Sequence, residues 1–336
     1  MLDFLLIEFL LTASTVSKNL LAVIADDMAQ VDELIRERLF SEVVLINQIS
    51  EYIIGGGGKR LRPALLLLVA GALGVESRDK YELAAVVEFI HTSTLLHDDV
   101  VDESNLRRGK QTANALFGNA ASVLVGDFLY SRSFQMMLKA NSMRVMQILA
   151  KATNLIAEGE VLQLLNMHDP NVNEAQYLQV IQYKTATLFE AATQLGAILG
   201  QADATMEKAL AEYGGHLGMT FQLMDDWLDY AGDSMLMGKN AGDDLREGKP
   251  TLPLIYVLHH GTLEEKNIVR EVIQNGGGDQ FERIFSAITR TGALDYTLQR
   301  AEFEANAAAE KLSGLPSSSY KKSLLELCDY LMTRRT

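Results

Sequence analysis

The chain carries long runs rich in Ala, Leu, Gln and Glu, and few stretches alternate apolar and polar residues as strands do. No proline interrupts the interval between Pro63 and Pro170. Hydrophobic residues make up 48% of the 336-residue sequence, which is enough to build a large core. The pattern predicts an all-α protein.

Turn-forming segments separate the helical stretches at 55–58, 103–111, 168–174, 231–250, 275–279 and 313–319. None resembles an interdomain linker, so we expect one domain over residues 17–336. The longest break, AGDSMLMGKNAGDDLREGKP, carries charges of both signs and is more typical of a functional lid. Residues 1–16 are apolar but too short to span a bilayer, and they lack the basic start of a signal peptide. We expect them to be a dispensable extension.

The net charge of −14 argues against nucleic acid as a partner, because binding phosphate backbones needs a basic surface. It also disfavours firm docking on anionic lipid, so we expect at most transient membrane contact. Cys328 is the single cysteine, which excludes an internal disulfide and fits a reducing, cytoplasmic location.

Two DDxxD motifs follow apolar runs. They comprise Asp98, Asp99 and Asp102 in the first, and Asp225, Asp226 and Asp229 in the second. Residues four apart on a helix are separated by roughly 40° around the axis, so the outer aspartates of each motif share a face. Such pairs of carboxylates suit Mg²⁺ that is also bound to substrate phosphate. The alternative is a solvated helix end, which two such motifs beside core segments make less attractive.

Basic residues accompany the acids. Arg107 and Arg108 follow the first motif, and guanidinium groups bind phosphate well, although they could also simply neutralise the aspartates. The segment GGGGKRLRP brings Lys59, Arg60 and Arg62 to a predicted helix start, which indicates a second phosphate site. It is not a Walker A loop, because no Ser or Thr follows the lysine. His91 lies two helical turns before Asp98 and would face the same site, although a lone histidine is usually a core residue.

Five segments in order resemble the trans-isoprenyl diphosphate synthase family. They are GGGGKRLRP, LLHDDVVDESNLRRG, YKTATLFEAA, FQLMDDWLDY and GKNAGDDLREGKPTLP. The segments GNAASVLVGDFLYSRSFQMM and IAEGEVLQLLN are most similar to the bacterial octaprenyl diphosphate synthases of that family. The resemblance implies a single-domain bundle of long helices around a large central cavity (the isoprenoid synthase fold), a homodimer, and Mg²⁺. It also implies addition of isopentenyl diphosphate to an allylic prenyl diphosphate, with an octaprenyl product for quinone side chains.

The resemblance further implies a role for each residue of these motifs. Mg²⁺ would be held by Asp98, Asp102 and Asp225, with Asp99, Asp226 and Asp229 completing or supporting the clusters. The allylic diphosphate would contact Arg107, Lys184, Thr185, Gln222 and Lys239, with Lys249 as a further contact. Isopentenyl diphosphate would contact Lys59, Arg62, His91 and Arg108, whereas Arg60 lies between contacts in the family's pattern. Some relatives also use a C-terminal arginine, here Arg334 or Arg335.

The small residues Ser93 and Thr94 lie below Asp98 on the predicted helix, where an aromatic side chain would stop chain growth early. We therefore expect a deep tunnel and a long product. Phe134 and Met137 are possible floor residues, with ordinary core packing as the alternative. Apolar helices at 114–130 and 186–200 could form the dimer interface.

Three other functions share parts of this pattern. A class I terpene cyclase would not need the GGGGKRLRP segment, and a phosphohydrolase built on His97 and Asp98 would need further histidines at suitable spacing. A non-catalytic subunit of a heteromeric synthase tends to lose one aspartate motif, and both are intact here.

Overall fold

The computed structural model describes residues 20–56, 58–107, 109–231, 242–277 and 280–333. Within these ranges the chain is helical apart from turns and one small antiparallel hairpin of β1 (Leu106–Arg107) and β2 (Lys110–Gln111). The all-α prediction is confirmed. The hairpin lies in the predicted turn 103–111 and carries Arg107.

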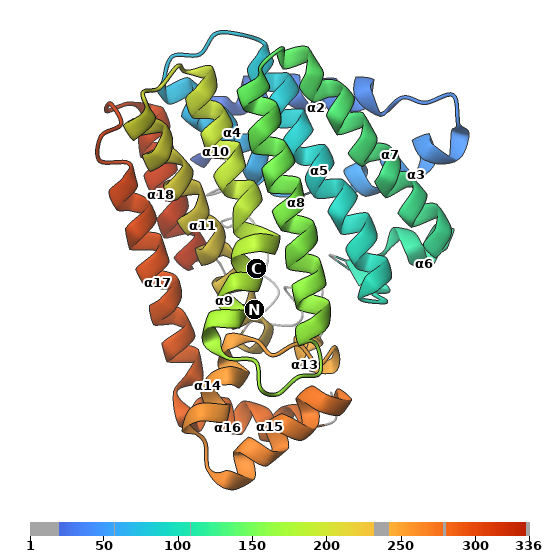
Figure 1. Cartoon of the computed structure of the whole chain (residues 1–336), viewed down its shortest axis with the longest axis vertical. Helices are drawn as coiled ribbons and strands as arrows, with labels where there is room; N and C mark the ends of the chain where they lie inside the picture. The colour runs from blue at the N-terminus through green and yellow to red at the C-terminus, as the bar shows by residue number, and fades with distance from the viewer. Residues whose placement is uncertain (1–19, 57, 108, 232–241, 278–279, 334–336) are drawn as a thin grey trace, which may run out of the picture.

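The helices of the N-terminal half are η1 (Ala22–Ile24), α2 (Ala25–Leu39), α3 (Val44–Gly55), α4 (Leu61–Ala72), α5 (Asp79–Val101), α6 (Ala113–Phe117), α7 (Asn119–Met137), η2 (Leu138–Ala140) and α8 (Met143–Asn166). Those that follow are α9 (Glu174–Ile181), η3 (Gln182–Ala186), α10 (Thr187–Leu199), α11 (Ala204–Ala231), α13 (Asp243–Arg246), α14 (Leu252–His260), α15 (Leu263–Asn275), α16 (Phe281–Thr291), α17 (Ala293–Lys311) and α18 (Ser319–Thr333). Figure 1 shows the long helices side by side in the upper body, with α14, α15 and α16 below.

Two helices join the upper and lower parts of the molecule. Along α11, Tyr213 lies in the large upper core, Leu223 in a middle cluster and Tyr230 in the lower cluster under α14 to α16. The helix α17 passes through the same three clusters and packs along α11. The active-site candidates on α11 therefore lie between the two parts, on a helix that is fixed at both ends.

Local sequence signals explain where the helices near the site begin. Asn173 and Gln176 form a capping box at the start of α9, in which each side chain accepts a hydrogen bond from the other's backbone N–H. Pro63 occupies the first turn of α4, where its missing N–H costs nothing. The predicted turn at 168–174 thus ends where α9 starts, and the predicted turn at 55–58 ends three residues before α4.

Apolar helices differ in how far they are buried. The segment 186–200, one of the two expected interface helices, corresponds to α10, and α10 packs between α4, α8 and α11 with most of its side chains buried. That expectation was wrong, because a helix covered on several sides has little surface left for a partner. By contrast, α7 exposes Leu124 (67%) and Tyr130 (37%). Among the described residues, no helix combines the length and apolar character needed to cross a membrane.

Candidate active site

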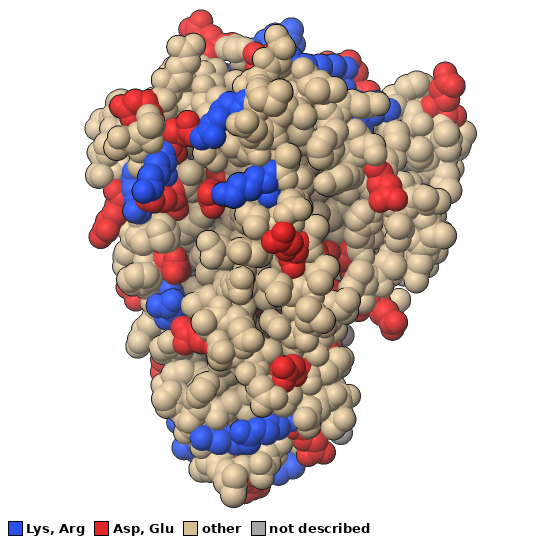
Figure 2. Space-filling model, viewed as in Figure 1, with Lys and Arg blue, Asp and Glu red and all other residues tan. Residues whose placement is uncertain are grey.

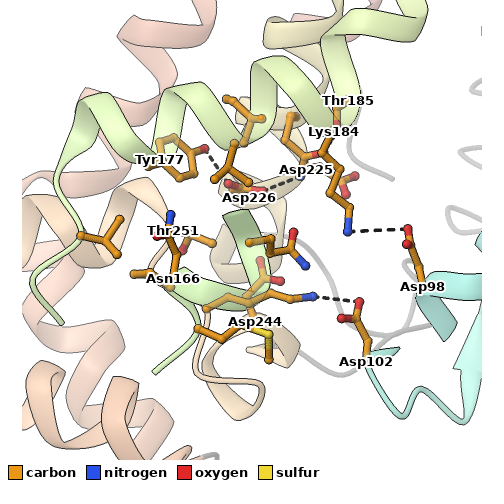
Figure 3. Close-up of a pocket in the computed structure, with 18 of the residues that line it drawn as sticks. Asp98, Asp102, Asn166, Tyr177, Lys184, Thr185, Asp225, Asp226, Asp244 and Thr251 are labelled. Carbon is orange, nitrogen blue, oxygen red and sulfur yellow. Dashed lines mark hydrogen bonds and ion pairs between the residues drawn. The ribbon is translucent and has the colours of Figure 1, made fainter. Parts of the chain in front are cut away.

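A cavity of about 210 Å³ lies where the C-terminal ends of α5 and α8 meet η3, α11 and the segment 244–251. Nine residues singled out by the sequence line it: Asp98, Asp102, Arg107, Lys184, Thr185, Gln222, Asp225, Asp226 and Lys249. Figure 3 shows Asp98 and Asp102 on one side of the cavity, with Lys184, Thr185 and Asp226 across from them. Residues up to 151 positions apart in the sequence are thus brought together around one space (249 − 98 = 151).

The outer aspartates of the first motif each face a lysine from across the cavity. Asp98 Oδ2 lies 3.6 Å from Lys184 Nζ, and Asp102 Oδ2 lies 3.0 Å from Lys249 Nζ (Figure 3). Burial raises the pKa of Asp98, and the positive charge of Lys184 opposes that rise. Burial alone would lower the pKa of Lys249, but the carboxylates of Asp102 and Asp244 outweigh it and raise the pKa. The four charges stabilise one another in a partly desolvated space.

The middle aspartate of the first motif points elsewhere. Asp99 is buried, and its Oδ1 accepts hydrogen bonds from Arg107 Nε at 2.9 Å and Arg107 Nη2 at 2.7 Å. This double contact fixes the arginine at the edge of the cavity on β1. The geometry favours a supporting role for Asp99 over direct metal ligation.

A hydrogen-bonded chain holds the second motif. Asp226 accepts hydrogen bonds from Tyr177 Oη at 2.6 Å and from Gln222 Nε2 at 2.8 Å. Gln222 Oε1 in turn accepts from Thr185 Oγ1 at 3.0 Å. Burial, and then the nearby Asp244, raise the pKa of Asp226 to about 8. Helices α9 and α11 and the η3 turn are therefore linked through polar side chains directly beneath the cavity.

The last aspartate of the second motif is directed towards a different element. Asp229 is buried, and its Oδ1 accepts a hydrogen bond from the backbone N–H of Asp243 at 3.2 Å. Its carbonyl accepts another from Gly242 N at 3.1 Å. Asp229 thus fixes the start of α13, the short helix before Lys249. This geometry favours a supporting role here too, and metal ligation by Asp229 stays a prediction.

Lys184 and Thr185 project from η3, a single turn of π-helix. Such turns are rare and frequently occur at functional sites. On the neighbouring α8, a Cβ at Gly159 would come within 2.6 Å of Lys184 N and 2.9 Å of Tyr183 Cβ. Only glycine lets α8 approach the turn this closely. The next residue, Glu160, then reaches Lys184 Nζ with its Oε2 at 2.6 Å.

Three residues at the site were not predicted. Asp244 and Tyr177 line the cavity, and Glu160 pairs with Lys184. Burial raises the pKa of Glu160 to about 7 even though Lys184 lowers it. All three occur in or beside segments that carried the resemblance, but no spacing rule indicated that they approach Lys184, Asp226 or Lys249.

The predicted second phosphate site lies apart from this cavity, at the start of α4. Arg62 Nη1 lies 3.1 Å from His91 Nε2, and the guanidinium of Arg62 stacks 4.6 Å from the ring centre of Phe189. Lys59 Nζ lies 5.9 Å from the ring centre of Tyr330 on α18. The structure therefore brings Arg62 and His91 together beside Lys59 in the chain, and their role in binding a diphosphate stays a prediction. Arg108, Lys239, Arg334 and Arg335 lie outside the described residues.

The proposed chain-length residues do not line the cavity. Ser93 is buried and donates a hydrogen bond to the Gly126 carbonyl at 2.8 Å, so its hydroxyl faces α7. Thr94 donates to the His91 carbonyl at 2.9 Å. Phe134 packs with its ring centre 5.1 Å from that of Tyr130, and Met137 is fully buried near the far end of α7. Their role in product length stays a prediction.

The carboxylates suit a divalent cation that also binds substrate. Among the described residues, no three His, Cys, Asp or Glu side chains lie close enough to hold a metal ion by themselves. The cavity instead offers carboxylates from two different helices: Asp98 and Asp102 from α5 on one side, and Asp225 from α11 on the other. Mg²⁺ commonly takes one or two carboxylates and completes its shell with water and phosphate oxygens. The donor set therefore fits Mg²⁺ bridged to a diphosphate.

Comparison with known proteins shows the family of the chain. Residues 43–288 match the model of the polyprenyl synthetase family. The chain belongs to that family. This polyprenyl synthetase is 52% identical over 311 residues to the octaprenyl diphosphate synthase of Escherichia coli (strain K12), covering 92% of this chain and 96% of that one.

Solved structures of the family share the fold of this chain. A polyprenyl synthase from Caulobacter crescentus CB15, complexed with calcium and isoprenyl diphosphate, superposes with a TM-score of 0.92 at 45% identity, over 95% of this chain and 98% of that one. A decaprenyl diphosphate synthase from Rhodobacter capsulatus gives 0.90 at 45% identity, over 95% and 99%. The predicted family and fold are confirmed.

Proposed function

We propose that this polyprenyl synthetase transfers an allylic prenyl group, starting from farnesyl diphosphate, to successive isopentenyl diphosphate units and releases octaprenyl diphosphate for quinone side chains. The observation that carries the proposal is the pairing of Asp98 and Asp102 with lysines across a cavity that also presents the second aspartate motif. A separate basic region around Arg62 and His91 supports a second diphosphate. The octaprenyl diphosphate synthase relative supports the product class.

In each cycle the allylic C–O bond breaks and releases diphosphate, and the isopentenyl double bond forms the new C–C bond. The resulting cation then loses a proton to the released diphosphate, which restores a double bond. Bound Mg²⁺, held by Asp98, Asp102 and Asp225, would supply positive charge at the departing diphosphate. Lys184, Lys249 and Arg107 bind the same group, and Thr185 and Gln222 orient it. Opposite charges about 4 Å apart interact by roughly 4 kcal/mol at an effective dielectric near 20, so several such contacts stabilise the leaving group substantially.

Product length is proposed to depend on the depth of an apolar tunnel below Asp98. Met137 lies 11 residues beyond Gly126 on α7, roughly 16 Å further from the site at 1.5 Å per residue. If Phe134 forms part of the floor, Phe134→Ala should shift the products by one or more isoprene units towards longer chains, as measured by mass spectrometry. An unchanged distribution would reject that assignment.

We also propose that the enzyme is a homodimer. Large apolar side chains are exposed along α7 and α8, among them Leu124 (67%), Val161 (57%) and Leu165 (70%). Figure 2 shows few charged side chains over these two helices. An apolar surface of this kind is typical of protein interfaces. A location in the cytoplasm stays a prediction.

The first experiment is mass spectrometry of products formed from farnesyl diphosphate and isopentenyl diphosphate with Mg²⁺. A dominant long all-trans prenyl diphosphate that disappears when EDTA is added is the expected result, and it also gives the chain length. Cyclic hydrocarbons formed from the allylic substrate alone would instead indicate a terpene cyclase. No consumption of isopentenyl diphosphate would point to a missing partner subunit.

A further inference from the structure

The basic segment at the start of α4 contains a residue in an unusual backbone conformation. Arg60 has φ 47° and ψ 36°, which is the left-handed region that residues with a Cβ seldom adopt. It stands between Lys59 and Arg62, the two basic residues expected to bind isopentenyl diphosphate. A non-glycine residue keeps such a conformation only when surrounding contacts hold it there.

Those contacts are two carboxylates. Arg60 Nη1 lies 2.9 Å from Glu88 Oε1 on α5, and Arg60 Nε lies 3.3 Å from Asp32 Oδ1 on α2. The side chains of Arg60 and Glu88 are 16% and 11% exposed, so both charges are largely removed from water. A buried carboxylate of this kind needs its cation, because an unpaired charge in the interior is costly.

The neighbouring basic residues have different partners. Arg62 contacts His91 and Phe189, and Lys59 lies near Tyr330. Because Glu88 and His91 are three residues apart on α5, their positions lie about 4.5 Å apart along the helix axis. The helix therefore holds the basic segment at two points, through Arg60 and through Arg62.

We propose that Arg60 and Glu88 are positioning residues for isopentenyl diphosphate: their ion pair fixes the left-handed turn that presents Lys59 and Arg62 to the ligand. Arg60 itself does not touch the diphosphate, since that would leave Glu88 buried without its cation. This inference rests on the proposed function. It predicts a defect confined to one of the two substrates.

The test measures steady-state KM for each substrate in four variants: Glu88→Met, Arg60→Met, the double variant, and Arg60→Gly. Glu88→Met and Arg60→Met should each raise KM for isopentenyl diphosphate about tenfold, equivalent to ~1.4 kcal/mol. The double variant should be no worse than either single variant, because both remove the same contact. Arg60→Gly should show a smaller rise, since glycine adopts the left-handed turn without strain. KM for farnesyl diphosphate should change less than twofold.

A matched control comes from a second ion pair of α5, which Glu82 forms with α2. Arg38 of α2 lies 2.5 Å from Glu82 of α5, with side chains 24% and 19% exposed, and within the described ranges this pair forms no ion pair with the basic segment. Glu82→Met should lower the unfolding temperature as Glu88→Met does, while leaving both KM values unchanged. An equal rise in KM for isopentenyl diphosphate in this control would overturn the proposal, because it would reflect a general loss of packing.

Three further outcomes test this inference and separate it from the proposed function. If Arg60→Met raises KM for isopentenyl diphosphate and Glu88→Met does not, Arg60 binds the ligand directly and the positioning role is wrong. If an active wild-type enzyme and the variants share the same KM values, only the inference fails. A wild-type protein that neither consumes isopentenyl diphosphate nor binds it in calorimetry with Mg²⁺ would overturn both.

Discussion

Cations at the two proposed diphosphate sites, called the allylic and the isopentenyl site below, have different kinds of partner. At the allylic site, Lys184 and Lys249 pair with Asp98 and Asp102, the carboxylates that we expect to bind metal. At the isopentenyl site, Arg60 pairs with Glu88, which lies outside the expected ligand set, and Arg62 stacks on Phe189. The lysines of the proposed allylic site are therefore shared between expected metal ligands and two further glutamates, Glu160 at 2.6 Å from Lys184 and Glu247 at 2.5 Å from Lys249. Arg60 instead pairs with Glu88 and Asp32, an isopentenyl support whose carboxylates both lie outside the expected ligand set.

This difference has a physical consequence for ligand binding. If these carboxylates hold Mg²⁺ and these lysines hold the allylic diphosphate, ligand binding would separate the lysine–aspartate pairs. The Arg60 and Glu88 pair can stay closed throughout. Substitutions at the allylic site should therefore change turnover, while those at the isopentenyl support should change the affinity for isopentenyl diphosphate.

The largest effect is expected from Asp98→Asn. Removing this carboxylate should lower kcat on the order of 10²–10³-fold, because charge stabilisation of the departing diphosphate is lost. The unfolding temperature should stay equal or rise, since burial already raises the pKa of Asp98 and a neutral side chain avoids that cost. Kinetics with farnesyl diphosphate and calorimetric unfolding check both parts.

Asp295→Asn on the exposed side of α17 is the control for turnover, which it should leave unchanged. Near-normal turnover in Asp98→Asn would remove the first aspartate motif from the mechanism.

A smaller effect should follow from Gly159→Ala. The new Cβ would overlap the η3 turn at Lys184 N, and either the turn or α8 must move. Such overpacking typically costs about 1–3 kcal/mol, and displacement of Lys184 should lower kcat/KM for farnesyl diphosphate by roughly tenfold. KM for isopentenyl diphosphate should be unaffected, in contrast to the Glu88 variants.

Gly215→Ala on α11 provides the comparison, because the nearest atom to its Cβ position is Glu190 Oε2 at an ordinary contact distance of 3.6 Å. Alanine should be neutral or slightly stabilising there. If both alanine variants keep the wild-type kcat/KM for farnesyl diphosphate, the close approach of α8 to η3 is not important for catalysis.

Much of the allylic site could be predicted because its residues follow short-range rules. Asp98 and Asp102 share a helix face by their spacing alone, and the paired motifs pointed to metal and phosphate. What could not be predicted are contacts between segments far apart in sequence. Glu160 reaches Lys184 only because α8 crosses η3 at a glycine, and Tyr177 reaches Asp226 from another helix.

The isopentenyl site shows a second limit of sequence reasoning. A run of basic residues predicts a phosphate site, but it does not reveal which side chain turns inward. The side chain of Arg60 points inward to Glu88 from a left-handed backbone. No residue pattern indicated that conformation. Similarly, α10 is as apolar as an interface helix, and only its neighbours on several sides show that it belongs to the core.

The smallest effect on turnover is expected from Glu160→Gln, which tests whether the allylic site carries unfavourable charge before ligands bind. Burial raises the pKa of Glu160 to about 7 in the folded protein, from the ordinary value of 4.5 for an exposed glutamate. Between those values the folded state binds more protons than the unfolded state, so stability falls as pH rises through this window. The free-energy cost of the ionised, buried Glu160 is therefore fully present above pH 7 and absent below about pH 4.5. Glutamine removes it.

Glu160→Gln should therefore exceed the wild type in free energy of unfolding by about 1–3 kcal/mol at pH 8 and by little at pH 5. Denaturant titrations at both pH values measure the difference, with Glu158→Gln on the exposed side of α8 as the control. If the free energies of unfolding of Glu160→Gln and wild type differ by the same amount from pH 5 to pH 8, Lys184 fully compensates the charge of the Glu160 carboxylate. In that case the allylic site would be as well balanced as the isopentenyl support, and the contrast between them would disappear.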